Sequence, residues 1–337
     1  MSVAATKGIA KRIAVSGVIA MDHLMTFPGR FPERPAADRP HVASLAFLAE
    51  RLGIRRGGAA ANIAFGLGRL GLDPVLVGAV GSDFADYQVW LKQHGVDTES
   101  VLVVPGEHTA RHVCTTDTEG ERFSTFRPGA MGASSALSLR SVAGRTGGLG
   151  LVVVAPGDPA AMLRHTEECR ALGLPFVAHP SWQIGGMGRA DLKYLISGAS
   201  CVVTDEGDAA RLREATGWSG PRILERVGAW VTTLGAAGVR IERAGHTPSL
   251  VPGIGSVAVA EPSGAGDALR AGLIAGVAQG APIERAAQLG CVLASFALEA
   301  TGAQEYAMDV RRLLNRAREA YGHTTAAAIR RLLTYAA

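Results

Sequence analysis

The sequence of 337 residues lacks several patterns that identify common classes of protein. Its four cysteines lie far apart without a CxxC pair, which excludes a zinc ribbon or a disulfide framework and is typical of reduced thiols in a cytosolic protein. No apolar run is long enough to span a bilayer, and no signal-peptide core follows the basic residues near the N-terminus. We therefore expect a cytoplasmic protein without a membrane partner.

Aromatic side chains are also few, and the net charge is small. Only 5% of the residues are aromatic, the net charge is +4, and the arginines are scattered along the chain. These features disfavour binding to nucleic acid, which uses clustered basic residues and stacking platforms. The sequence has no HExxH zinc motif, no GxSxG elbow of a serine hydrolase and no GxxxxGK[ST] P-loop. Any binding of phosphate must therefore use another kind of site.

Small and apolar residues are abundant instead. The chain is 47% hydrophobic and has 43 glycines, enough for a sizeable core with many tight turns. Its length allows two domains, or one large α/β domain with an insertion. Strand-like runs at 12–16, 75–80, 151–154, 176–178, 201–203 and 230–234 alternate with helical patterns, which predicts a parallel sheet covered by helices. In such sheets, ligands bind beyond the carboxyl ends of the strands.

Two segments depart from this alternation. Residues 27–56 are proline-rich at first, poorly periodic and too long for a simple connection. Residues 107–130 read as strands that pair with one another. We predict that these two segments form a small β lid, and that residues 11–26, 57–106 and 131–337 form a large α/β catalytic domain.

A glycine-rich turn at residues 260–272 is the most informative stretch of the sequence. A β-like run stops at Pro262, and Gly264 and Gly266 precede a helical pattern of small residues. Glycines let successive N–H groups point into one hollow, and the positive end of the following helix favours an anion such as phosphate. Asp267 stands beside that hollow, where it either handles a proton or a metal or merely caps the helix.

Two further glycine turns follow predicted strands or precede predicted helices. Asp22, with Gly57, Gly58 and Asn62, offers hydrogen bonds to a polyol, although the same residues also suit a loop and a helix start. The turn at 233–238 either lies against a nucleotide or forms a plain hairpin. Residues 66–71 match the dinucleotide motif GxGxxG, but they fall at the far end of a helix, which predicts a role in packing.

These three clusters, in this order, resemble the PfkB, or ribokinase-like, family of sugar and nucleoside kinases. Residues 261–267 are similar to the family's DTxGAGD signature, and Gly57-Gly58 with Asn62 match its early motif. Residues 19–25, 27–31, 81–87, 165–170 and 301–306 look like the actinobacterial-type adenosine kinases of this family. The resemblance implies a ribokinase-like, doubly wound, mostly parallel sheet flanked by helices, with a small β-sheet lid that also forms a homodimer in several members.

The resemblance also implies an activity and a site. The reaction is transfer of the γ-phosphoryl group of ATP, with Mg²⁺, to a primary hydroxyl of a nucleoside, a nucleoside-like metabolite or a sugar. Asp267 matches the general base, and the amides of Gly264, Ala265 and Gly266 match the anion hole. The residues implied on the substrate side are Ser16, Asp22, Gly57, Gly58, Asn62, His112 and Phe126. Those implied on the nucleotide side are Asp205, Asp208, Thr233, Gly235 and Gly238, with Asp208 near the metal, through water.

Several positions depart from the family pattern. Glu261 replaces an Asp of the signature, Leu269 replaces a Phe, and the Asn-x-x-Glu motif tied to magnesium reads as residues 205–208, DEGD. His112 falls where an aromatic residue stacks the base. An Asp-Pro pair appears as His179-Pro180, and glycines 185 and 186 stand where an Arg is expected. The changes affect the acceptor pocket and the metal motif more than the phosphoryl-transfer core.

Three hypotheses follow. The first is an ATP-dependent kinase with Asp267 as its base. The second is a kinase-derived nucleoside- or nucleotide-binding regulatory protein with weak or no phosphoryl transfer, suggested by Asp205 and Asp208. The third is a different reaction at the 5′-position of a nucleoside that uses the same base and anion hole.

Overall fold

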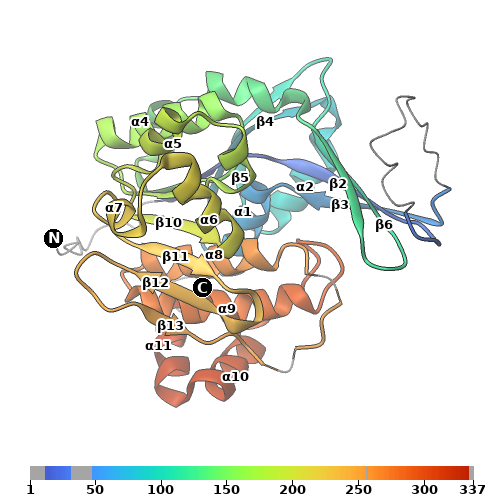
Figure 1. Ribbon diagram of the computed structural model, residues 1–337. Helices are drawn as coiled ribbons and strands as arrows, with labels where there is room; N and C mark the ends of the chain where they lie inside the picture. Colours follow the sequence, from blue (N-terminus) through green and yellow to red (C-terminus); the bar gives the residue numbers. More distant parts are fainter. Residues whose placement is uncertain (1–11, 32–47, 256, 261, 334–337) are drawn as a thin grey trace, which may run out of the picture.

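The computed structural model describes residues 12–31, 48–255, 257–260 and 262–333. They form a nine-stranded sheet covered by helices and a separate four-stranded sheet that projects from one side (Figure 1). The α/β class and the small accessory sheet agree with the sequence prediction. In the part of the chain that the structure describes, no helix combines the length and apolar character needed to cross a membrane.

The large sheet has the order β13-β12-β11-β10-β9-β8-β1-β4-β5. All neighbouring strands are parallel except that β12 runs antiparallel to both β11 and β13. The strands are β1 (Arg12–Ser16), β4 (Val75–Gly81), β5 (Asp97–Val104), β8 (Leu149–Val154), β9 (Phe176–Ala178), β10 (Cys201–Asp205), β11 (Trp230–Thr233), β12 (Val239–Glu242) and β13 (Ser249–Val251).

Both faces of this sheet are buried, as expected for parallel strands that carry continuous apolar runs. Val15 packs in one cluster with helices α1, α8 and α9, and its neighbour Ala14 packs in another with α3 to α7. The helices are α1 (Ala59–Arg69), α2 (Ala85–Gln93), α3 (Leu139–Thr146), α4 (Pro159–Leu172), α5 (Arg189–Ile196), α6 (Glu206–Thr216), α7 (Gly220–Leu224), α8 (Ala265–Ala278), α9 (Ile283–Leu298), α10 (Val310–Tyr321) and α11 (His323–Leu333).

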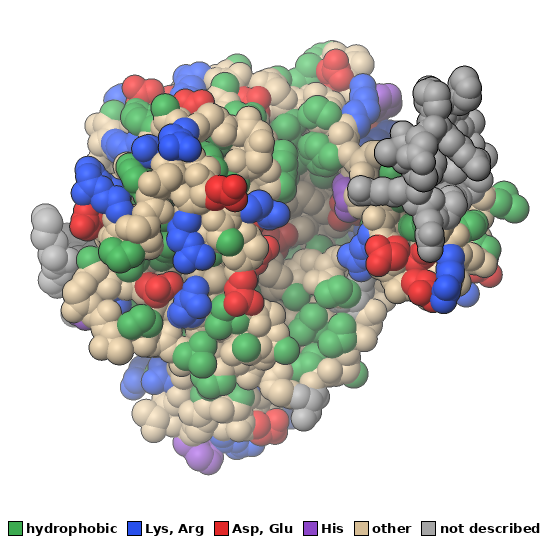
Figure 2. All heavy atoms as spheres, viewed as in Figure 1, with side chains coloured by type: hydrophobic (Ala, Val, Ile, Leu, Met, Phe, Trp, Pro, Cys, Tyr) green, Lys and Arg blue, Asp and Glu red, His purple; other side chains and the backbone are tan. Residues whose placement is uncertain are grey.

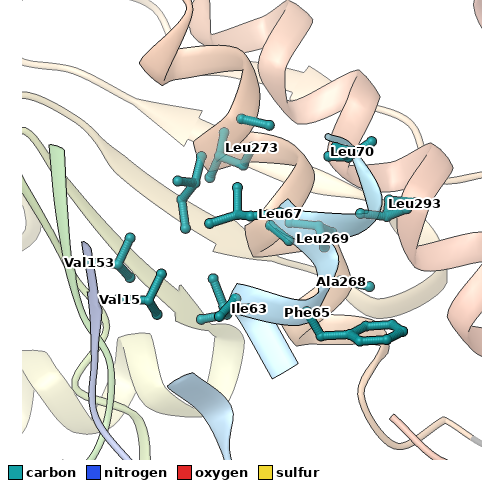
Figure 3. Packing of buried hydrophobic residues seen from close by; sticks show 14 of the residues in the cluster. Val15, Ile63, Phe65, Leu67, Leu70, Val153, Ala268, Leu269, Leu273 and Leu293 are labelled. Atoms are coloured by element: carbon teal, nitrogen blue, oxygen red, sulfur yellow. The ribbon is translucent and has the colours of Figure 1, made fainter. Parts of the chain in front are cut away.

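The first cluster brings α1 against α8, and this contact positions the candidate site. Figure 3 shows Val15 and Val153 of adjacent strands facing Ile63 of α1, with Leu269 of α8 close by. A Cβ on Gly66 would lie 2.5 Å from the Cβ of Ala271, so only glycine permits this approach. The GxGxxG match at 66–71 therefore serves helix packing at the end of α1, as the sequence predicts.

The four-stranded sheet has the order β3-β2-β6-β7. Its strands are β2 (Ala20–Thr26), β3 (Arg51–Gly57), β6 (Ala110–Thr116) and β7 (Arg122–Arg127). The sequence prediction placed residues 20–26 in the large domain, but β2 is a central strand of the small sheet, where most of its side chains are half-buried. Of the predicted lid segments, residues 32–47 lie outside the described residues.

Candidate active site

The parallel strands β1, β8, β9, β10 and β11 all end at one edge of the large sheet, where polar loops gather. The small sheet projects beside this edge, and Figure 2 shows a hollow between it and the large domain. Such an edge is where open α/β sheets bind ligands. The candidate site lies along it.

Helix α8 begins in this region at a turn that requires glycine. Gly264 precedes the helix with φ of 83°, and a Cβ there would lie 2.4 Å from the Cβ of Ala303. No side chain among the described residues caps this helix start; Glu261 lies outside them. The first N–H groups of a helix lack intrahelical acceptors, so this start suits an anion.

Asp267 lies in the first turn of α8 and is largely buried, with 16% of its side chain exposed. The Asn62 side chain donates a hydrogen bond of 2.9 Å to one carboxylate oxygen, and Arg270 Nη1 lies 3.4 Å from the other. Burial raises the pKa of Asp267, and the charge of Asp22 adds to the rise. Arg270 and Asn62 oppose it, so both oxygens of the buried carboxylate face donors.

Arg270 links Asp267 to the end of β10. Its side chain is only 9% exposed, and burial lowers its pKa. The carboxylates of Asp267, Asp208 and Asp205 all favour its charged form. The guanidinium therefore lies among three acids, two of which are in the altered 205–208 motif.

Among the residues expected on the acceptor side, Asp22 and His112 are paired residues of β2 and β6, with Asp22 Oδ1 3.6 Å from His112 Nδ1. Gly57 lies against Asp22, since a Cβ there would fall 2.3 Å from its carboxylate. Gly58 caps α1 with φ of 92° in a crowded position that only glycine suits. These residues, predicted from separate parts of the sequence, meet at the root of the small sheet.

Phe126 lies next to His112 across the β6–β7 pair. Its ring centroid is 5.4 Å from that of Trp182, which belongs to the short 3₁₀ helix Ser181–Gly185 after β9. Both rings are partly exposed. The sequence reasoning missed Trp182, because its position opposite the small sheet is set only by the tertiary fold.

Among the residues expected on the nucleotide side, Thr233 and Asp205 are paired residues at the ends of β11 and β10. The turn after Thr233 joins β11 to the antiparallel β12, which confirms the hairpin. Gly238 has φ of 100° and packs against the backbone after β13. Gly235 has φ of 56°, and a Cβ there would meet no atom within 4 Å.

Asp205 at the end of β10 and Asp208 in the first turn of α6 are the acidic side chains beside which a magnesium ion is expected. Asp208 is buried and accepts a hydrogen bond from Arg211, while Asp205 caps α6 by accepting one from the Asp208 amide at 2.6 Å. Within the described ranges, no group of three or more His, Cys, Asp or Glu is arranged to hold a metal. The residues fit a magnesium ion held mainly by nucleotide phosphates and waters, rather than an all-protein site.

Two predicted or noted residues lie apart from the cluster. The Ser16 hydroxyl lies 2.6 Å from Nδ1 of the buried His165, whose Nε2 is 3.1 Å from the Leu137 carbonyl. Ser16 thus faces the layer of α3 and α4 and not Asp267. His179 is buried, and burial together with the charge of Arg270 lowers its pKa far below the usual value, so it is neutral and contacts the Val203 carbonyl.

Tyr87 and Gln304 are polar residues of the site that sequence reasoning left without a role. Gln304 donates to Asn62 at 2.9 Å and also bonds Tyr87, which donates to the Gly57 carbonyl at 2.8 Å. A signal existed, because both lie in segments that resemble adenosine kinases, at 81–87 and 301–306. Nothing in the sequence showed that the two segments meet.

Comparisons with known proteins identify the family of the chain. The model of the pfkB family of carbohydrate kinases matches residues 18–310. A nucleoside kinase of Methanothermobacter thermautotrophicus is 29% identical over 270 residues, which cover 79% of this chain and 86% of that protein.

Solved structures give the same result. The nucleoside kinase of Burkholderia thailandensis in complex with inosine is 31% identical, with a TM-score of 0.82 over 92% of this chain and 98% of that one. Its complex with ADP-inosine superposes with a TM-score of 0.80, at 31% identity over 92% of this chain and 96% of that chain. The Methanocaldococcus jannaschii nucleoside kinase, at 24% identity, shares the fold with a TM-score of 0.80 over 92% of this chain and 98% of that one.

The glycine turn before Asp267 and the match across residues 18–310 lead to one conclusion. The chain belongs to the pfkB family of carbohydrate kinases, has the ribokinase-like fold, and is a phosphotransferase with an alcohol acceptor.

Proposed function

We propose that the protein is an ATP-dependent nucleoside kinase that phosphorylates a primary hydroxyl of its substrate, with Asp267 as general base. The observation that carries the proposal is the meeting of Asp267 with the uncapped start of α8 and with Asn62. A carboxylate that can accept a proton, the backbone N–H groups at the start of α8 and the Asn62 side chain therefore lie close together. Similarity to kinases in complex with inosine and ADP-inosine supports a nucleoside acceptor and ATP as the donor.

In this mechanism, Asp22 and Asn62 hold hydroxyls of the sugar, and Gly57 allows the sugar to approach the backbone. Phe126 and Trp182 provide an aromatic surface for the nucleobase, and His112 lies beside Phe126. The reacting hydroxyl lies by Asp267, which takes its proton as the oxygen attacks the γ-phosphorus. The raised pKa of Asp267 brings its proton affinity closer to that of a working base at neutral pH.

The amides of Gly264, Ala265 and Gly266 stabilise the charge on the transferring phosphoryl group. Thr233, Gly235 and Gly238 line the nucleotide. Asp205 and Asp208 face its phosphate end, and Arg270 interacts with these two carboxylates and with that of Asp267. A magnesium ion bound with the nucleotide would neutralise charge on the phosphates, and Asp208 would hold it through water.

A second candidate is a regulatory protein that binds nucleoside or nucleotide with little phosphoryl transfer. The specific observation in its favour is that Asp208 is buried and paired with Arg211, which occupies one of the two carboxylate oxygens otherwise available to a metal-bound water. The two candidates differ in turnover and not in binding.

An acceptor screen tests the proposal. The protein is incubated with MgATP and a panel of purine nucleosides, pyrimidine nucleosides, ribose and fructose, and products are identified by mass spectrometry. We expect nucleoside monophosphates. Nucleoside binding by calorimetry with no product, also after Asp205→Asn and Asp208→Glu, would favour the binding protein, and phosphorylation of free sugars alone would contradict the nucleoside acceptor.

We further propose that the small sheet forms a homodimer through its outer face. Leu52, Ile54 and Phe123 project from the face opposite Asp22 and are more than half exposed. Sedimentation of the wild type against Phe123→Ser tests this, because the variant should shift toward monomer. A monomeric wild type would contradict the proposal.

A further inference from the structure

A chain of buried hydrogen bonds connects the backbone of Gly57 to Asp267. Tyr87 OH donates to the Gly57 carbonyl at 2.8 Å, and Gln304 Nε2 bonds both Tyr87 OH and Asn62 Oδ1, the latter at 2.9 Å. Asn62 Nδ2 then donates to Asp267 at 2.9 Å. Tyr87, Asn62 and Gln304 are 3%, 7% and 1% exposed. The chain joins residues that are more than 200 positions apart.

The direction of these bonds is fixed from one end. The Gly57 carbonyl has no hydrogen, so the Tyr87 hydroxyl must donate to it. The Tyr87 oxygen then accepts, which requires the NH₂ group of Gln304 to face it. The second hydrogen of that NH₂ group points to Asn62, which must present its oxygen. The NH₂ group of Asn62 is therefore left to face Asp267.

The reverse arrangement conflicts with an ionised Asp267. If the Gln304 amide were turned over, Asn62 would have to donate to it and would place its own oxygen against the Asp267 carboxylate. Two acceptors would then meet in a buried site, which is tolerable only when Asp267 carries a proton. The orientation of two amides is thus coupled to the charge of one carboxylate.

We propose that Tyr87 and Gln304 are positioning residues that act through Asn62 to keep Asp267 a hydrogen-bond acceptor. The inference rests on the proposed function in so far as Asp267 is the base, since a base must be ionised before it takes the substrate's proton. The Gly57 carbonyl belongs to the strand end that packs against Asp22. The same backbone position therefore serves the acceptor pocket and the orientation of the base.

Other charged and titratable groups around Asp267 also affect its protonation. Arg270 of α8 faces one oxygen and favours the carboxylate, whereas Asp22 of β2 disfavours it. Tyr306, after α9, is buried, and burial together with the charge of Asp267 raises the pKa of its hydroxyl. Burial itself raises the pKa of Asp267, so the hydrogen bond from Asn62 works against that rise.

A pair of conservative variants tests the proposal. Tyr87→Phe removes the hydroxyl that fixes the direction. Tyr306→Phe is the matched control, because the Tyr306 hydroxyl is also buried but has no hydrogen-bond partner in the described part of the chain. The titration of Asp267 is followed by ¹³C NMR of labelled aspartate carboxyls and assigned with Asp267→Asn. We expect Tyr87→Phe to raise the titration midpoint by about one pH unit and Tyr306→Phe to leave it in place.

Two more substitutions extend the test. Gln304→Met should raise the midpoint as Tyr87→Phe does. If Tyr87→Phe does not fold, Gln304→Met takes its place as the test of the proposal. Gln304→Glu should raise it further, because a carboxylate beside Asn62 draws the Asn62 NH₂ group away from Asp267. In a kinase assay, the acid limb of kcat/KM should move with the NMR midpoint.

Equal midpoints in the wild type, Tyr87→Phe and Gln304→Met would overturn the proposal, as would an equal shift in Tyr306→Phe. The outcome is separable from the proposed function. A wild type that phosphorylates no acceptor but shows the expected midpoints would refute the kinase and support the hydrogen-bond chain.

Discussion

Arg270→Met is the substitution whose effect follows most directly from the charges around the site. Arg270 is 9% exposed and lies 3.4 Å from Asp267, which is 16% exposed. Removing the cation leaves the buried carboxylate with only the Asn62 hydrogen bond. Asp208 keeps its pair with Arg211, and Asp205 is exposed to solvent. The loss of Arg270 therefore destabilises these two carboxylates less than it destabilises Asp267. Breaking a buried ion pair from one side costs about 3–5 kcal/mol of folding stability.

The loss should depend on pH in a defined direction. The pKa of Asp267 is already raised by burial, and removal of Arg270 raises it further. A carboxyl whose pKa is higher in the folded than in the unfolded state lowers stability as pH rises from the unfolded-state pKa to the folded-state pKa, and the loss stays constant above that. At lower pH, Asp267 escapes by taking up a proton. The variant should therefore be closer to the wild type at about pH 4, near the pKa of an unfolded aspartate, than at about pH 8.

Urea unfolding at both pH values measures the effect. The control is Arg222→Met, which removes the same side chain from an i,i+3 pair with Glu225 whose members are 48% and 55% exposed. Exposed pairs contribute about 0–1 kcal/mol, so this variant should change little at either pH. A loss in Arg270→Met no larger than in the control, or one independent of pH, would refute the electrostatic account of Arg270.

Three other substitutions have defined outcomes. Gly57→Ala puts a Cβ 2.3 Å from the Asp22 carboxylate, so steady-state kinetics should show a nucleoside KM raised by about tenfold or more, and an unchanged KM would contradict the contact. Trp182→Ala, which removes the ring opposite Phe126, should raise the nucleoside KM about tenfold but not the MgATP KM; equal changes would argue against a base-stacking surface. Gly272→Ala puts a Cβ 2.6 Å from the α9 backbone and should cost about 1–3 kcal/mol in urea unfolding with substrate KM retained; full stability would contradict the close helix contact.

The fold was largely predictable because its signals are local. Buried parallel strands read as short apolar runs between glycine turns, and the alternation with helices indicated the layered α/β architecture. Residues 20–26 were assigned with the large domain because they follow β1 closely in the chain, whereas the structure pairs them with the strands of the small sheet. The sequence reports exposure along a strand but not which sheet the strand joins.

The site was predictable only where its requirements are also local. Gly58 and Gly264 adopt positive φ at helix starts, and glycine at such points is visible in the sequence. Arg270 and Trp182 acquire their meaning from residues that the fold brings to them. No spacing rule connects Trp182 with Phe126, and none shows that Arg270 points back to Asp267 instead of outward.

The measurement that tests the central claim most directly compares the wild type with Asp267→Asn. Nucleoside binding is measured by calorimetry and phosphoryl transfer from MgATP by single-turnover kinetics. If Asp267 is the base, the variant should bind the nucleoside nearly as well as the wild type and transfer the phosphoryl group about 10²–10⁴-fold more slowly. Transfer at the wild-type rate with intact binding would contradict the assignment of Asp267 and the mechanism that depends on it.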